Sequence, residues 1–112
     1  MGIVRLFNEI MTPAMAKRFE DALASGSLRQ LSAELSAEGL SQAAIYHQFE
    51  SFADIVERAG RTVDESELYF AMECIVGYCT PSNKWFDHYL TNEEIYAYRS
   101  SLAEPGASVN AG

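Results

Sequence analysis

Long apolar runs, export leaders and enzyme motifs are all missing from this sequence of 112 residues. No segment approaches the roughly 18 consecutive apolar residues that a membrane span requires. The first residues do not combine a basic leader with an unbroken apolar stretch, so we expect no export signal and a cytoplasmic protein. There is no glycine-rich phosphate loop, nucleophile elbow or Cys-x-x-Cys pair. We therefore predict a protein that is not an enzyme and that needs no cofactor.

Cysteine and histidine are scarce, with two of each. Cys74 and Cys79 are five residues apart on one predicted helix, which turns them about 140° from each other. We interpret them as buried free thiols, and an intermolecular or redox disulfide is the alternative. His47 and Glu50 lie at i and i+3, but metal centres in helical bundles need ligands from facing helices. A solvated polar face is the simpler interpretation, so we predict no metal site.

Basic residues are also few, since eight bases face sixteen acids and the formal net charge is −8. Residues 1–40 hold five acids and four bases, whereas residues 41–112 hold eleven acids and four bases. The acidity therefore belongs to the second part of the chain. Such a field repels nucleic acid and anionic lipid and favours basic partners. Plain solubility is the alternative explanation for it.

What the sequence does contain is helical periodicity, most clearly in the stretch Leu68–Cys79. Only Glu73 in this stretch is charged, and a helix that is apolar nearly all round belongs in the middle of a bundle. Glu73 and Gly77 share the one remaining side. The apolar residues at i, i+4, i+7 and i+11 fall on one line: Leu68, Met72, Ile75 and Cys79.

The longest predicted helix is Gln42–Ala59, which Gly60 ends. Its apolar residues have the same spacing as those of Leu68–Cys79, so the two helices should form an antiparallel hairpin. Asp64, in the link between them, is a natural N-cap for the second helix. The apolar line on the first helix consists of Ile45, Phe49, Phe52 and Val56.

Shorter helices are predicted on either side of this hairpin. They span Ile3–Met11, a segment that Thr12 and Pro13 begin and Ser25-Gly26 ends, a segment from Ser27 to Gly39, and a last helix from Thr91 through Leu102. The fold class is therefore all-α: a compact bundle of about five to seven short-to-medium helices around the central apolar helix. Residues 1–103 would form a single domain, and residues 104–112 a flexible tail.

An acidic row is the most suggestive surface feature. Glu50, Asp54 and Glu57 lie at i, i+4 and i+7, turned by more than 90° from the apolar line of the same helix. Three further acids follow in the link, and two aromatic residues could anchor a partner. The full predicted binding set is Glu50, Asp54, Glu57, Asp64, Glu65, Glu67, Tyr46 and Trp85.

Trp85 has two interpretations. It lies in an aromatic segment after a proline turn, and exposed aromatic residues beside acids are typical of protein-binding hot spots. If Trp85 is exposed it marks an interface, and if it is buried it caps the end of the bundle.

In size, charge and helix content the chain is similar to the small acidic helical immunity proteins that neutralise basic nuclease toxins in bacteria. This resemblance implies carboxylates and a few tyrosines on one face of a compact bundle. Our leading hypothesis is a non-catalytic protein that binds a basic protein partner through an acidic helix face. One alternative is a homo-oligomeric structural or regulatory module, for example a homodimer. In it, a second copy of the chain covers the aromatic residues that the core does not bury. A second alternative is a small metal- or ligand-binding enzyme that uses Glu73, His47 or His88.

Overall fold

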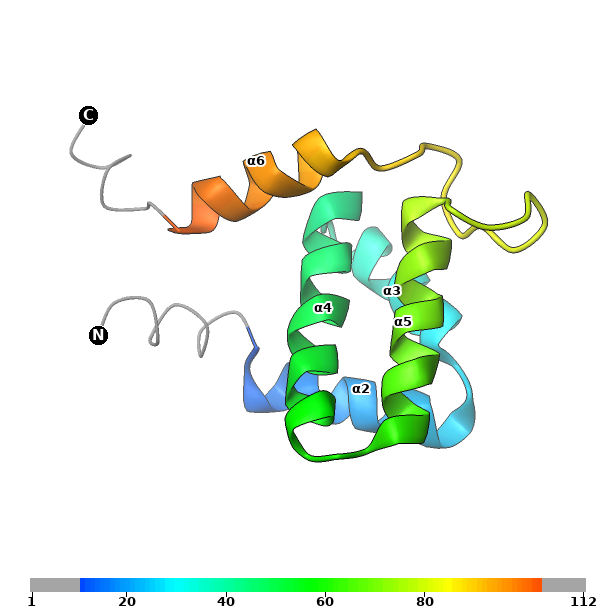
Figure 1. Ribbon diagram of the computed structural model, residues 1–112, viewed down its shortest axis with the longest axis vertical. Coiled ribbons are helices and arrows are strands. Elements are labelled where there is room, and N and C mark those ends of the chain that lie inside the picture. Colours follow the sequence, from blue (N-terminus) through cyan, green and yellow to red (C-terminus); the bar gives the residue numbers. More distant parts are fainter. Residues whose placement is uncertain (1–10, 104–112) are drawn as a thin grey trace.

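The computed structural model describes residues 11–103, and this part of the chain is all-helical. Its helices are α2 (Pro13–Ser25), α3 (Leu28–Ala37), α4 (Gln42–Arg58), α5 (Thr62–Val76) and α6 (Asn92–Ala103). The predicted fold class, an all-α bundle of about five to seven helices, is confirmed, with five helices among the described residues (Figure 1). The predicted helix Ile3–Met11, except its last residue, and the predicted tail 104–112 lie outside the described residues.

Local capping explains where several of these helices begin. The Thr12 hydroxyl accepts a hydrogen bond from the Met15 amide at 3.1 Å, with Pro13 in the first helical position. At α6, the Glu94 amide donates to the Thr91 hydroxyl while the Thr91 amide donates to the Glu94 carboxylate. This reciprocal pair is a capping box, which satisfies two amides that the helix itself leaves free. The predicted starts at Thr12 and Thr91 are confirmed.

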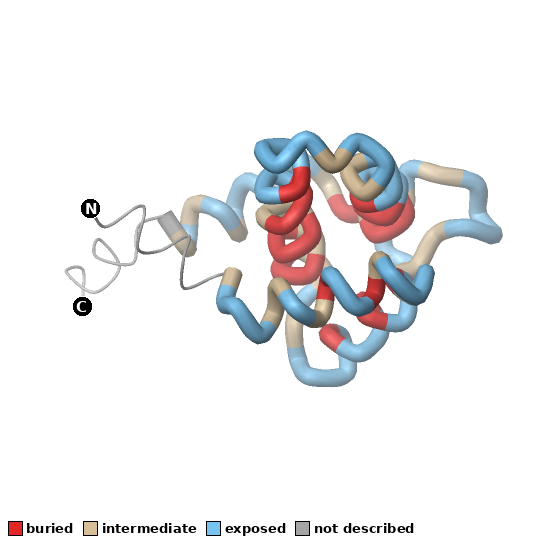
Figure 2. The backbone as a smooth tube through the Cα atoms, turned by 90° about the horizontal axis from the view of Figure 1, so that it is seen from below, coloured by how far each residue is buried: buried red, intermediate tan, exposed pale blue. Residues whose placement is uncertain are grey.

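The antiparallel hairpin of α4 and α5 is the centre of the fold, and these two helices lie side by side in Figure 1. The predicted apolar line of α4 is almost completely buried, with no member more than 1% exposed. Phe19 of α2 enters this core, with its ring stacked on Phe52 at 4.9 Å and edge-on to Phe49 at 4.8 Å. Three residues of α3 complete the core: Leu28, Leu31 and Leu35. Figure 2 shows that the buried residues lie on the inward sides of the helices.

The boundaries predicted for the apolar helix are wrong at both ends. Helix α5 begins at Thr62, so Asp64 lies in its first turn and does not cap it. It ends at Val76, because Gly77 adopts a left-handed conformation with φ 96°, which glycine accepts at little cost. The amides of Gly77 and Tyr78 both donate to the Glu73 carbonyl, at 2.9 and 3.0 Å. Gly77 is therefore the stop signal of α5 rather than a residue inside it.

The outer side of α5 is not covered by other helices. Its inner residues are buried, but Val63, Tyr69 and Phe70 are 73%, 43% and 54% exposed. The expectation that neighbours would cover this apolar helix nearly all round is wrong for that side. Glu73 is exposed, so the slot that it occupies is open to solvent.

An irregular connection leads from α5 to α6 and folds back over the end of the hairpin. The Trp85 amide donates to the Cys74 carbonyl at 3.0 Å, and the Leu90 amide donates to the Val76 carbonyl at 2.9 Å. Gln42, the first residue of α4, fastens the same region, because its side-chain amide donates to the carbonyls of Ile75 and His88, both at 2.8 Å. Within residues 11–103 we find no helix with the length and apolar character needed to cross a bilayer.

Candidate protein-binding face

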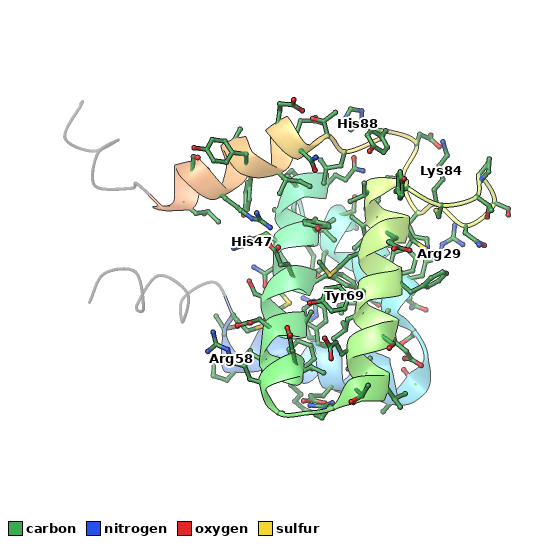
Figure 3. All side chains as sticks on the ribbon, viewed as in Figure 1. Arg29, His47, Arg58, Tyr69, Lys84 and His88 are labelled. Atoms are coloured by element: carbon green, nitrogen blue, oxygen red, sulfur yellow. The ribbon has the colours of Figure 1, made fainter. Side chains whose placement is uncertain are left out.

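Four residues at the seam of α4 and α5 form what we call the acidic face: Asp54, Glu57, Glu65 and Tyr69. Tyr69 lies over the seam between the two helices (Figure 3). Partial burial raises the pKa of the Tyr69 hydroxyl, and the neighbouring carboxylates of Glu57, Glu65 and Asp54 raise it further because they disfavour a phenolate. The hydroxyl therefore stays protonated and can donate a hydrogen bond. The acidic face combines negative charge with a half-exposed aromatic ring.

Two carboxylates of the acidic face have no ion-pair partner among the described residues. Among residues 11–103, neither Glu57 nor Glu65 forms an ion pair. Asp54 does form one, with Arg58 at 3.1 Å, but both side chains are more than half exposed. An exposed i,i+4 pair of this kind contributes only a few tenths of a kcal/mol. All three acids are therefore free to meet a cation from outside.

Glu50, the first acid of the predicted row, has a structural role instead. The Arg99 guanidinium of α6 donates to its carboxylate, and His47 Nδ1 lies 3.7 Å from it. Burial alone would raise the pKa of Glu50, but His47 and Arg99 outweigh burial and lower that pKa below its ordinary value. Glu50 thus holds α6 against α4, and its charge is compensated within the chain.

Two acids of the predicted link do not lie on the acidic face. Asp64 pairs with Arg61 at 2.8 Å, and Arg61 also pairs with Glu20 of α2 at 2.8 Å. Hydrogen bonds to Glu20 and then Asp64 raise the pKa of the Arg61 guanidinium, so this network ties α2 to the start of α5. Glu67 lines a cavity on another side of α5. The six predicted acids therefore do not form one continuous surface.

The two predicted aromatic anchors are both half-buried. Partial burial and then the Glu50 carboxylate raise the pKa of Tyr46, and Tyr69 is also among its neighbours. Trp85 packs on the bundle with its ring 6.3 Å from that of Phe49, and it also lines the cavity beside Glu67. Ser66 and Phe70 line that cavity too, on a side of α5 about 100° round from Glu65 and Tyr69. The Trp85 ring therefore contacts the core at Phe49 and also lines a surface cavity that is separate from the acidic face.

The binding set predicted from the sequence does not include Tyr69. A signal for it was present, since Glu65, Tyr69 and Glu73 follow one another at i, i+4 and i+8. The interpretation of His47 as part of a solvated polar face is wrong. His47 is only 7% exposed, because α6 covers it and the ring of Tyr98 lies 5.7 Å away. Neither of its ring nitrogens has a hydrogen-bond partner among the described residues.

The two cysteines are free thiols, but only Cys74 is fully buried. Burial and then the neighbouring Cys79 thiol raise the pKa of Cys74 to about 11. Cys79 lies beyond Gly77 and outside α5, so the predicted separation of 140° along one helix does not apply. Within residues 11–103, no three His, Cys, Asp or Glu side chains are grouped so that they could hold a metal ion.

Comparisons of the chain with protein-family models, with curated proteins and with solved structures returned no significant match. A function must therefore be inferred from the surface of this chain. The acidic face combines acids that form no strong ion pair among the described residues with an accessible aromatic ring.

Proposed function

We propose that this chain is a non-catalytic protein that binds a basic protein partner through the acidic face. The observation that carries the proposal is the position of Tyr69 between Glu57 and Glu65, whose charges have no cationic partner within residues 11–103. A half-exposed tyrosine can supply apolar area and one hydrogen bond at little entropic cost, while the carboxylates select a cation. The same proposal places the protein in the cytoplasm and gives it no nucleic-acid partner.

The charge of the whole chain supports this proposal. A net charge of −8 accelerates encounter with a basic protein over distances comparable to the Debye length, which is about 8 Å at physiological ionic strength. At short range, the basic partner is contacted by the four residues of the acidic face: Asp54, Glu57, Glu65 and Tyr69. An immunity or antitoxin protein that covers the basic active surface of a toxin is one concrete instance of this function.

Affinity capture from an extract of the source cells tests the proposal. The bait is used at low salt in three forms: the wild-type chain, Glu57→Gln/Glu65→Gln, and the control Asp87→Asn/Glu93→Gln. Both variants remove two exposed or half-exposed acids that form no ion pair among the described residues, so they change the net charge equally. Only the first alters the acidic face.

We expect the wild type and the control to recover the same basic protein and the Glu57→Gln/Glu65→Gln variant to lose it. For the purified pair, that variant should bind at least about tenfold more weakly, which corresponds to 1.4 kcal/mol. Equal loss by both variants would show that net charge alone attracts the partner, and equal recovery by all three baits would show that Glu57 and Glu65 do not contribute to binding; either result would contradict the proposal. Failure of the wild-type chain to recover any basic protein at low salt would also contradict the proposal.

A further inference from the structure

A second surface lies on the opposite flank of α5 from the hairpin partner, where a cavity of about 500 Å³ opens between α3 and α5. Its apolar walls come from Leu28, Phe70, Ala71 and Trp85. A cavity of this size is large enough for a large side chain, since pockets for small molecules begin at about 300 Å³. The cavity is thus an open apolar site that the acidic face does not include.

One side of α5 continues this cavity and carries two exposed apolar residues, Val63 and Phe70, with Glu67 between them. Val63, Glu67 and Phe70 lie at i, i+4 and i+7, so they share one side of the helix. Val63 is 73% exposed and Phe70 is 54% exposed. Phe70 is therefore both a wall of the cavity and a projecting side chain beside it. In a two-fold dimer, an exposed apolar side chain such as Phe70 on one copy can enter an apolar cavity on the other copy if the two lie side by side on the same surface.

The two charges at this cavity are opposite. Arg29 lines it from α3 and Glu67 lines it from α5. Neither forms an ion pair among residues 11–103, although five of the other described bases do. A two-fold axis exchanges the two sides of such a surface. Arg29 of one copy would then meet Glu67 of the other, and this would happen twice.

We propose that a second copy of this chain covers this surface in a two-fold symmetric dimer. Phe70 of each copy enters the cavity of the other, between Leu28 and Trp85, and the two Arg29–Glu67 pairs form across the axis. Charge complementarity favours a second copy over a basic partner here, because the cavity carries one positive and one negative charge whereas the acidic face carries only negative ones.

A dimer of this kind needs an interface of standard size. Helix α5 has 15 residues and is therefore about 22 Å long. A standard interface buries roughly 800 Å² on each partner, which is about a ninth of the 7023 Å² surface of this chain. Tyr69 lies about 100° away round α5, so the acidic face stays accessible in the dimer.

Light scattering coupled to size-exclusion chromatography, over a range of concentrations, tests the proposal. The wild-type chain should reach twice its monomer mass of 12.4 kDa as concentration rises. Phe70→Glu should weaken this association at least about tenfold, since it places a charge in an apolar site. The matched control is Tyr96→Glu on α6, where an aromatic side chain is 72% exposed but lies away from the cavity. It should leave the dimer unchanged.

Charge exchange gives a second arm that does not depend on the apolar contact. Arg29→Glu alone and Glu67→Arg alone should each weaken the dimer, and the two substitutions together should restore it. Circular dichroism checks that every variant is folded. A wild-type chain that remains monomeric at all concentrations would overturn the proposal. So would a dimer that survives Phe70→Glu, a dimer that Tyr96→Glu disrupts equally, or a double exchange that fails to restore association.

Discussion

Gln42 provides the sharpest test of how the fold is held together. Its side-chain nitrogen donates to the carbonyls of Ile75 and His88, so one residue joins the start of α4, the end of α5 and the connection to α6. Both acceptors are carbonyls, so the donor must be the amide nitrogen. Gln42→Leu removes both hydrogen bonds, of which the one to Ile75 is part-buried and the one to His88 is exposed to solvent.

The expected loss follows from these two contacts. The part-buried bond to Ile75 contributes about 1 kcal/mol net and the exposed bond to His88 less than about 0.5 kcal/mol, so Gln42→Leu should lower the free energy of unfolding by about 1 to 1.5 kcal/mol. For a domain of this size, such a loss lowers the melting temperature by roughly 5 to 8 °C. Urea denaturation and thermal melting followed by circular dichroism measure both quantities.

The control for this experiment is Gln30→Leu on α3. The Gln30 amide reaches only Glu34, at 3.4 Å on an exposed surface, so its loss should change stability by less than about 0.5 kcal/mol. If Gln42→Leu melts at the same temperature as the wild type and the control, the end of the hairpin is not fastened by Gln42. That result would refute the account of how the connection between α5 and α6 is positioned.

Three further predictions concern single groups. Because burial and the Cys79 thiol raise the pKa of Cys74 to about 11, iodoacetamide at mildly alkaline pH should label Cys79 in the folded protein and spare Cys74; equal labelling rates would contradict this. Arg61 lowers the pKa of Glu20, so the stabilisation from this pair is present above the ordinary carboxyl range and is lost as pH falls through the lowered pKa. Glu20→Gln should therefore flatten the acid limb of the stability curve, and an unchanged limb would argue against the pair. His47→Leu removes two buried ring nitrogens that lack a hydrogen-bond partner among the described residues, but it also removes the group 3.7 Å from Glu50 that helps to lower the pKa of that carboxylate. These effects oppose each other, so stability should change by less than about 1 kcal/mol while the pKa of Glu50 rises; an unchanged Glu50 pKa would contradict the contact.

The core could be predicted from the sequence because it depends on local periodicity. The spacing of Ile45, Phe49, Phe52 and Val56 fixes one side of α4 whatever the other helices do, and all four are buried. The caps at Thr12 and Thr91 are equally local, since each depends on residues within one turn. These features follow from helix geometry alone.

The end of α5 and the pairing of the acids could not be predicted in the same way. A glycine after an apolar run is compatible both with a helix interior and with a left-handed residue that ends the helix. Gly77 is left-handed, and the backbone of Tyr89, a residue distant in sequence, lies beside it. Whether an acid is free depends on contacts with distant segments. Arg99 is 49 residues from Glu50, and Arg61 reaches Glu20 over 41 residues. Helical spacing contains no information about such pairs, so the predicted row included acids that the fold neutralises.

The most direct test of the proposed function is to map the surface that the basic partner touches. A nuclear magnetic resonance titration of the labelled chain with the basic protein recovered by affinity capture gives a shift for each amide. We predict that the largest shifts fall on Asp54, Glu57, Glu65 and Tyr69 and that they disappear as salt is raised. Shifts spread evenly over all exposed acids, including Asp87 and Glu93, or centred away from the seam of α4 and α5, would contradict the account.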